Sequence, residues 1–243
     1  MYKVLSSDAL FYEIRDVAKF MFDKGWAERN AGNFSYRINS QDLKKYRNYY
    51  NVETELPLVD FRLNISEDKD LVFVISTSGS RFRDIVKDPV TNTCLVHISK
   101  NKSVVYTVSE YDKPSSEFPS HTLIHAFLSE QKPEQIAIVH THPTNIIALS
   151  HKFGDSSKSR YNEILNSVMP EVSMFIKNGI GLVELLEAGS FELATETLRE
   201  LQNHDLVIWK KHGIFCVAVD LWEAADSIDI VDKAAKIILL AQL

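Results

Sequence analysis

The sequence predicts a single α/β domain in which helices pack against a central sheet. Short apolar runs of strand length alternate along the chain with longer segments whose apolar residues fall on one helical face. No shift in composition interrupts this alternation, so we expect one domain over residues 1–243. The 243 residues are 45% hydrophobic and 25% charged, which is sufficient for a full core. Alternation alone leaves open whether the strands run parallel or antiparallel.

The first half of the chain opens with a helix and a strand. Asp8 is a typical N-cap for a helix with apolar residues at helical spacing, and Gly25 is a typical stop. Apolar and polar residues alternate over 34–38, which predicts a half-buried strand. Residues 39–70 are polar and aromatic without a clear period, so we interpret them as a long excursion. The other elements expected in this half are strands at 71–75, near 93–99 and near 102–108, and a helix over about 116–130.

The second half opens with an apolar strand at 136–139 and ends with a helix over about 221–241, whose apolar residues share one face. Pro143 suits the first turn of a helix that ends near His151. Gly189 is interpreted as an ordinary glycine at a helix boundary. The other elements expected here are a helix after the polar loop at 154–159, strands near 172–176 and 181–186, a helix at about 190–203, and strands at 206–209 and 214–218.

Composition argues against two classes of binding protein. The chain has only 8 glycines and contains neither G-x-G-x-x-G nor G-x-x-x-x-G-K-[ST], so the glycine loops that bind nucleotides are absent from the sequence. Lys and Arg number 27 against 33 Asp and Glu, a net charge of −6 without a basic stripe, and no nucleic-acid partner is expected. An anionic substrate therefore needs a local site made of backbone amides, hydroxyls or a metal.

The sequence predicts a cytoplasmic protein without a membrane partner. Cys94 and Cys216 lie far apart in strand-like apolar runs, which is typical of small buried hydrophobic residues rather than a disulfide framework. Charged residues at 8–16 occupy the stretch that a signal peptide needs apolar. No run approaches the roughly 18 apolar residues that span a bilayer.

Histidines at one predicted strand end indicate a metal site. His140 and His142 are two residues apart in an extended segment, so they project to the same face. Catalytic zinc takes three protein ligands and keeps an open position. His212, in the turn between two predicted strands, is the natural third ligand. The alternatives are hydrogen-bonded or surface histidines and an ordinary turn residue. His121 and His125 also have ligand spacing on a helix, or else one is packed and the other solvated.

An acidic residue and two serines stand at a predicted helix start. Glu117 suits a general acid/base beside the metal, with Ser115, Ser116 and the free amides of the helix start forming a seat for an anion. The alternative is an acid that the helix dipole favours in the first turn. Two further turns, at 30–33 and 76–80, are rich in hydroxyl and amide groups. Each either cradles a phosphate or simply reverses the chain.

Together these motifs resemble those of the class II aldolase/adducin family, in order along nearly the whole chain. The matching motifs are KGWAERNAGN at 24–33, TSGS at 77–80, SSE at 115–117, HTHPTNIIAL at 140–149 and HDLVIWKKHG at 204–213. The resemblance implies a three-layer α/β/α domain with a largely antiparallel central sheet. It also implies a homotetramer with its sites near subunit interfaces.

The resemblance implies a set of site residues. One Zn²⁺ per subunit would be bound by His140, His142 and His212. Glu117 would exchange the proton at the enediolate carbon, and Glu171 matches a second, catalytic acidic position. The residues implied to bind the substrate phosphate are Asn30, Asn33, Ser78, Gly79, Ser115 and Ser116.

The activity that this resemblance implies is a zinc-dependent retro-aldol reaction. We expect cleavage of L-rhamnulose 1-phosphate to dihydroxyacetone phosphate and L-lactaldehyde through a metal-stabilised enediolate. The excursion at 39–70 and the lead-in at 25–30 favour this sugar. The alternatives in the same family are cleavage of L-fuculose 1-phosphate and 4-epimerisation of a pentulose phosphate. A non-catalytic, adducin-like binding module is the alternative of another class, and the joint presence of three histidines and Glu117 argues against it.

Overall fold

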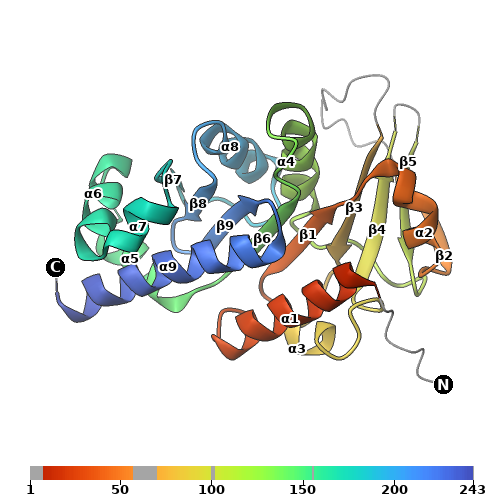
Figure 1. Ribbon diagram of the computed structural model, residues 1–243, viewed down its shortest axis with the longest axis horizontal. Helices are drawn as coiled ribbons and strands as arrows, with labels where there is room; N and C mark the ends of the chain where they lie inside the picture. The colour runs from red at the N-terminus through yellow and green to blue at the C-terminus, as the bar shows by residue number, and fades with distance from the viewer. Residues whose placement is uncertain (1–7, 57–69, 100–101, 155, 243) are drawn as a thin grey trace.

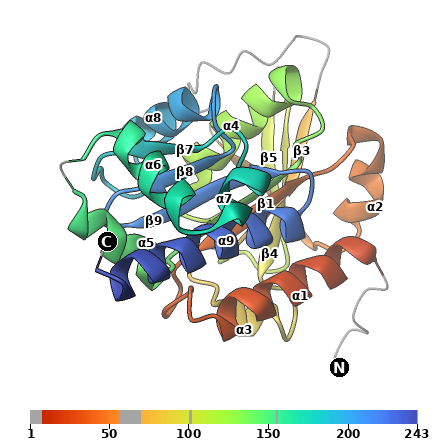
Figure 2. The same cartoon turned by 60° about the vertical axis from the view of Figure 1, so that its left-hand side comes forward.

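The computed structural model describes residues 8–56, 70–99, 102–154 and 156–242. Over these residues one sheet has the strand order β2-β5-β4-β3-β1-β6-β9-β8-β7, and helices cover both of its faces (Figures 1 and 2). The strands are β1 (Asn33–Arg37), β2 (Val52–Leu56), β3 (Leu71–Ser76), β4 (Thr93–Ile98), β5 (Ser103–Thr107), β6 (Ala137–Thr141), β7 (Ile180–Val183), β8 (Leu206–Trp209) and β9 (Gly213–Ala218).

The helices include both long and single-turn elements. The long helices are α1 (Ala9–Asp23), α4 (Phe118–Gln131), α5 (Thr144–Lys152), α6 (Lys158–Val168), α8 (Phe191–Leu201) and α9 (Leu221–Leu240). The short ones are η1 (Ser40–Asp42), α2 (Leu43–Arg47), α3 (Phe82–Ile85) and α7 (Pro170–Phe175). None of the helices in the described ranges is both long enough and apolar enough to cross a membrane.

The sheet is antiparallel except for one pair of strands. Every neighbouring pair runs antiparallel apart from β7 and β8. Only a few residues separate β4 from β5 and β8 from β9, which requires opposite directions, whereas β7 reaches β8 through helix α8 and can run parallel to it. The predicted fold class, a three-layer α/β/α arrangement around a largely antiparallel sheet, is confirmed.

Two apolar layers lie on opposite faces of the sheet. In β3, Val72 and Val74 join the larger cluster, which contains the buried side chains of α1 and α9. Phe73 and Ile75 point the other way, into a cluster that also contains Ala126 of α4. Because both faces are covered, the strand sequence is apolar at five of its six positions instead of alternating.

The start and the end of α1 follow the sequence prediction. The Asp8 carboxylate accepts a hydrogen bond of 3.0 Å from the Leu10 amide at the helix start. At the other end Gly25 has φ +72°, and the amide of Trp26 donates to the Met21 carbonyl at 3.1 Å. This turn aims the Trp26 carbonyl at the segment after β6, where it accepts from the His142 amide at 2.8 Å.

One predicted strand is wrong. Residues 172–176 were expected as a strand, but the structure forms α7 over Pro170–Phe175, with Ile176 as its C-cap. Pro170 fits the first turn of a helix, and Val172 is the only residue of α7 that is buried. The apolar run therefore divides around a short helix, with Val172 and Ile176 buried and Met174 and Phe175 exposed, and is not a strand of the sheet.

The predicted excursion at 39–70 is more ordered than expected. Its described part contains η1, α2 and the edge strand β2, which pairs with β5, while 57–69 lie outside the described residues. The sequence of β2, VETEL, alternates with two glutamates, but only Val52 and Leu56 are apolar and three of the five side chains are exposed, so the pattern of a half-buried strand is weak. Two smaller differences are that α3 was not expected and that Pro143 is the N-cap of α5, before its first turn.

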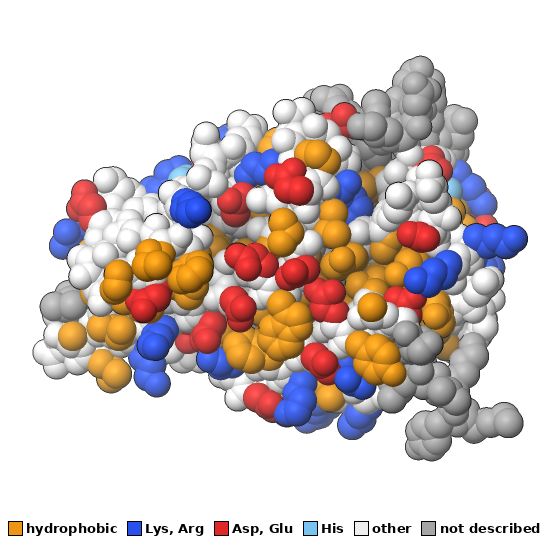
Figure 3. All heavy atoms as spheres, in the orientation of Figure 1, with side chains coloured by type: hydrophobic (Ala, Val, Ile, Leu, Met, Phe, Trp, Pro, Cys, Tyr) orange, Lys and Arg blue, Asp and Glu red, His pale blue; other side chains and the backbone are white. Residues whose placement is uncertain are grey.

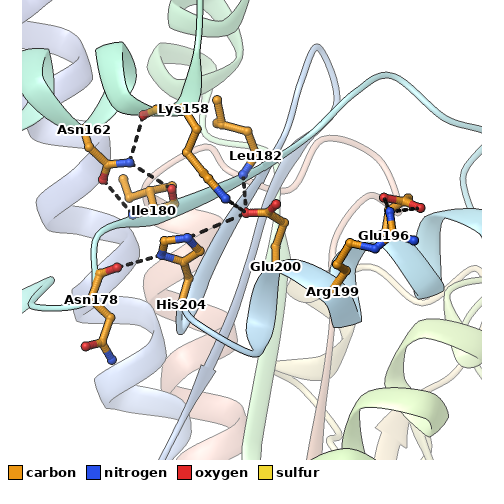
Figure 4. Close-up of polar contacts among 9 residues, drawn as sticks. All are labelled: Lys158, Asn162, Asn178, Ile180, Leu182, Glu196, Arg199, Glu200 and His204. Carbon is orange, nitrogen blue, oxygen red and sulfur yellow. Dashed lines mark hydrogen bonds and ion pairs between the residues drawn. The ribbon is translucent and has the colours of Figure 1, made fainter.

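Side chains close the free edge of the sheet at β7 (Figure 4). The Asn162 carboxamide accepts from the Ile180 amide at 2.8 Å and donates to the Ile180 carbonyl at 3.0 Å. The Glu200 carboxylate accepts from the Leu182 amide at 3.3 Å and pairs with Lys158 at 2.7 Å. The amide and carbonyl of Ile180 and the amide of Leu182 are thus unavailable for pairing with another chain.

Replacing Asn162 with Ala is expected to lower the free energy of unfolding by about 1–2 kcal/mol, because both backbone groups of Ile180 lose their partner. Urea denaturation measures this change, and light scattering reports any aggregation through the opened edge. Asn203→Ala, an exposed asparagine after α8, is the control and is expected to change neither. Equal stability of the two variants would contradict the edge-closing role of Asn162.

The face drawn in Figure 3 carries many acidic side chains among apolar ones. Burial and the neighbouring carboxylates Asp229 and Asp220 raise the pKa of Asp226 on α9. Burial similarly raises the pKa of Glu13 on α1, with a smaller contribution from Asp220. The neighbouring carboxylates of α1 and α9 create a negative local potential, so an anionic substrate needs a separate site with its own hydrogen-bond donors.

Candidate active site

The ends of β6 and β9 bring three histidine rings together. His140 lies in β6, His142 follows it, and His212 lies in the turn before β9. The ring centroids are 5.0 Å apart for His140 and His142, and 4.9 Å apart for each of the other two pairs. Their ligand nitrogens all lie within 4.8 Å of one another, so one ion can contact all three.

Gly213 allows the turn to approach β6 this closely. It opens β9, which pairs with β6 so that Thr141 lies opposite Ile214. A Cβ atom added at Gly213 would lie 2.5 Å from the Thr141 carbonyl oxygen and 2.9 Å from the His142 ring. Any side chain at this position would therefore push the turn and His212 away from the other two histidines.

Hydrogen bonds orient two of the rings for metal binding. Nδ1 of His140 donates to the Ile214 carbonyl at 3.0 Å, and Nδ1 of His142 pairs with the Glu28 carboxylate at 2.8 Å. Both Nε2 atoms are therefore free to act as ligands, and they lie 3.2 Å apart. Two ligands of a tetrahedral zinc ion, with Zn–N bonds near 2.0–2.1 Å, are separated by about 3.3 Å. The site fits a divalent metal.

Burial and the neighbouring rings keep His140 and His212 neutral, which is the form that binds metals. Burial, then the neighbouring His142 and His212 rings, holds the pKa of His140 well below its usual value. Burial and the His142 ring lower the pKa of His212 to about 4. The His140 ring also packs on Trp209, with ring centroids 4.4 Å apart. The Trp209 indole is in turn held by a 2.9 Å bond to the Thr197 hydroxyl.

Glu117 is buried at the start of α4, with only 3% of its surface exposed. Burial raises the pKa of its carboxyl to about 7, and a 3.1 Å hydrogen bond from the Gly189 amide partly offsets this rise. A carboxyl with this pKa gains and loses a proton readily near neutral pH, as a general acid/base must.

The histidines and Glu117 share a cleft of about 190 Å³ with hydroxyl and amide groups. Its lining residues are Asn30, Ala31, Gly32, Asn33, Thr77, Ser78, Gly79, Ser115, Ser116, Glu117, His140, His142, Ala188 and His212. This set contains all six residues predicted to bind phosphate. It contains no Lys or Arg from the described part of the chain, so backbone amides and neutral side chains provide the donors.

Backbone contacts assemble the three turns of this cleft. The amide of Ser78 donates to the Lys113 carbonyl at 2.7 Å, and the amide of Ser115 donates to the Ser76 carbonyl at 3.0 Å. These bonds join the turn after β3 to the segment before α4. The first turn comes close to β6 because Gly32, at φ +78°, has no side chain; a Cβ there would lie 3.0 Å from the His140 carbonyl oxygen.

Three predicted candidates lie elsewhere. Glu171 is exposed on α7 and is not among the residues that line the cleft, so its catalytic role stays a prediction. His121 and His125 do not belong to the histidine triad. Both are fully buried, so the alternative in which one of them is solvated is wrong.

Sequence reasoning missed two residues that support the site. Gly189 is not an ordinary boundary glycine: its amide binds Glu117, it has φ +75°, and a Cβ would lie 2.6 Å from the Ser116 carbonyl oxygen. No local signal marks it, because the contact joins loops 72 residues apart. Trp209 was predicted only as part of a strand. Its position three residues before His212 was the one sequence signal that could have linked it to the site.

Comparison with known proteins identifies similar chains. Residues 12–239 match the family described as "Class II Aldolase and Adducin N-terminal domain". The chain is 32% identical over 231 residues to a protein of Bacteroides thetaiotaomicron named rhamnulose-1-phosphate aldolase, covering 95% of this chain and 85% of that protein. A protein of Listeria welshimeri with the same name is 26% identical over 228 residues, covering 93% and 81%.

A solved structure shares the fold. The crystal structure of a sugar-phosphate aldolase from Thermotoga maritima superposes with a TM-score of 0.80 and 32% sequence identity. The superposition covers 96% of this chain and 94% of that one.

Proposed function

The chain belongs to the class II aldolase and adducin family and is a metal-dependent aldolase, and on this premise we propose that it cleaves L-rhamnulose 1-phosphate. The products would be dihydroxyacetone phosphate and L-lactaldehyde. The observation that carries the proposal is the single cleft that unites three metal-binding imidazoles, a buried carboxyl and six candidate phosphate-binding residues. The name of the Bacteroides thetaiotaomicron relative supports this choice of sugar.

We propose zinc as the metal, held by His140, His142 and His212. Three imidazole nitrogen ligands with an open position for water or substrate are the donor set of many catalytic zinc sites. When bound there, the ion supplies positive charge that stabilises the negative charge developing on the substrate oxygens.

The residues of the chain would then bind the substrate and move its protons. Asn30, Asn33 and the donors of the two serine turns would bind the phosphate, which fixes the sugar in the cleft. A base takes the proton of the C4 hydroxyl, C4 becomes the carbonyl carbon of lactaldehyde, and the C3–C4 bond breaks with its electron pair left on C3 as an enediolate. Glu117 would deliver a proton to C3 and complete dihydroxyacetone phosphate. Glu171 remains our proposal for a second catalytic acid.

We also propose a cytoplasmic homotetramer. Cys94 and Cys216 are buried and unpaired, which suits a reducing compartment. Met174 and Phe175 on α7 expose 59% and 57% of their surface beside Glu171, which supports an interface at this helix. Such an interface would bring Glu171 near a neighbouring subunit, as the resemblance to the family implies.

Metal analysis and a coupled assay for dihydroxyacetone phosphate test the proposal together. We expect one zinc per chain, cleavage of L-rhamnulose 1-phosphate in preference to L-fuculose 1-phosphate, loss of activity on chelation, and recovery on adding Zn²⁺. Cleavage of fuculose 1-phosphate alone would reassign the substrate. Failure to cleave either sugar with the metal site filled would refute the proposed aldol substrates.

A further inference from the structure

Two buried histidines of α4 lie behind the wall of the cleft. His121 and His125 are one helical turn apart, have no exposed surface, and contact the same hydroxyl of β1. Oγ of Ser35 lies 2.6 Å from His121 Nδ1 and 2.7 Å from His125 Nε2. The remaining nitrogen of His121, Nε2, lies 2.6 Å from Oδ1 of Asn33. Because Asn33 lines the cleft, the hydrogen bonds form a continuous chain from the interior to the substrate site.

Both rings are neutral, and each therefore carries one N–H. Burial lowers the pKa of His121 to about 3. Burial, then the His121 ring and Arg37, holds the pKa of His125 well below its usual value. Aromatic neighbours contribute to this apolar setting: Phe215 lies 5.6 Å from the His121 ring, centroid to centroid, and Phe73 lies 5.0 Å from the His125 ring.

The unpaired Nδ1 of His125, at the inner end of this series of hydrogen bonds, determines the direction of every bond in the series. Nδ1 of His125 is buried and finds no partner among the described residues. A proton there would create a buried N–H donor without an acceptor, which is rarer in proteins than an unpaired acceptor. The proton of His125 therefore lies on Nε2, which donates to Ser35.

The remaining protons follow from this assignment. Ser35 has a single proton and, having accepted from His125, donates it to Nδ1 of His121. His121 then carries its own proton on Nε2, which donates to Oδ1 of Asn33. The amide oxygen of Asn33 is thus occupied by His121, and its NH₂ group remains available to donate to a ligand in the cleft.

We propose that His125, Ser35 and His121 are positioning residues that present the Asn33 NH₂ group, rather than its oxygen, to the phosphate of the substrate. This inference rests on the proposed function, in which Asn33 belongs to the phosphate site. A reversed carboxamide would aim an acceptor at an anion. Without these hydrogen bonds, the Asn33 carboxamide would occupy both orientations. The affinity for the phosphate would then be lower, but the rate of proton transfer at Glu117 would be unchanged.

Ser35→Ala removes the hydroxyl that links the two histidines, and it changes the side-chain volume very little. We expect KM for the ketose 1-phosphate and the inhibition constant of inorganic phosphate to rise together by about ten-fold, with kcat within about two-fold of the parent. Ser120→Ala is the matched control, because it removes an equally buried hydroxyl of α4 that has no hydrogen-bond partner among the described residues. The control is expected to leave KM unchanged.

A second pair of variants separates hydrogen bonding from packing. His125→Gln keeps a side-chain N–H where Nε2 donates, and we expect its KM to be close to that of the parent enzyme. His125→Leu removes the donor, and we expect it to match Ser35→Ala. Equal KM values for His125→Gln and His125→Leu, or an unchanged KM in Ser35→Ala, would overturn the proposal.

The donor and acceptor roles in this series of hydrogen bonds can be measured by spectroscopy without substrate. Imidazole ¹⁵N spectra of histidine-labelled protein should show the Nε2–H tautomer for both His121 and His125, with His121 becoming a mixture in Ser35→Ala. Nδ1–H at either ring in the parent protein would overturn the proposal. If the parent cleaves no ketose 1-phosphate, but the tautomers and the weakened phosphate binding of Ser35→Ala are as expected, the proposed function fails while the positioning role stands.

Discussion

Glu117→Gln is expected to lower turnover on the order of a thousand-fold while the protein keeps its metal. A general acid/base contributes roughly 10²–10⁴-fold to a rate, and glutamine cannot exchange the proton that the enediolate carbon needs. The amide retains an oxygen that can accept from the Gly189 amide, so the loop at Gly189 should stay in place. Steady-state kinetics of the coupled assay and metal analysis of the same preparation measure both effects.

The same variant should be more stable than the parent above neutral pH when both are stripped of metal. The pKa of Glu117 is about 7 in the folded protein and 4.5 unperturbed, so the folded state holds its proton more tightly. Parent stability therefore falls as pH rises from about 4.5 through 7, by on the order of 3 kcal/mol in total. Glutamine does not ionise, and its protein should lack this slope in urea unfolding.

Glu187→Gln is the matched control for both measurements. It makes the same carboxylate-to-amide change at an exposed position of the loop that carries Gly189. Turnover and the pH dependence of unfolding should match those of the parent. If Glu117→Gln retained turnover within ten-fold of this control, another group would have to supply the proton.

His212→Ala is expected to abolish both metal retention and aldol cleavage. The remaining two imidazoles leave the ion one protein ligand short of a catalytic zinc site. Loss of the bound ion removes several kcal/mol of charge stabilisation, which corresponds to roughly a thousand-fold or more in rate. Equilibrium dialysis against Zn²⁺ and the coupled assay measure the two losses.

His212 is a suitable ligand to remove because it lies in a turn, where the cost to folding is smaller than for the fully buried His140. His151→Ala, an exposed histidine on α5, is the control for nonspecific zinc binding and should retain one ion and full activity. Stoichiometric zinc in His212→Ala with unchanged affinity would remove this residue from the ligand set.

Elements with local signals were predicted well. Asp8 and Gly25 mark the limits of α1 through hydrogen bonds that span only a few residues. β2 and α7 were missed for different reasons. β2 is a strand because it pairs with β5, although most of its side chains are exposed. The apolar composition of α7 resembles that of a short strand, so composition alone predicts the wrong element.

The sequence by itself determined the chemistry that this protein has available. Three histidines, Glu117 and the hydroxyl-rich turns are recognisable because their residue types and order carry the signal without any coordinates. The order of the motifs also indicated the family, which the comparison over residues 12–239 confirmed.

Only the tertiary structure decided how these groups are oriented and supported. The contacts between Gly189 and Glu117 and between Glu28 and His142 join residues 72 and 114 positions apart, and the hydrogen bonds that link His125 to Asn33 join residues 86 to 90 positions apart. No periodic pattern records such pairs, because a hydrogen bond over that separation exists only once the sheet has formed. Burial, which sets the pKa of Glu117 and the neutrality of the imidazoles, is likewise a property of the packed molecule.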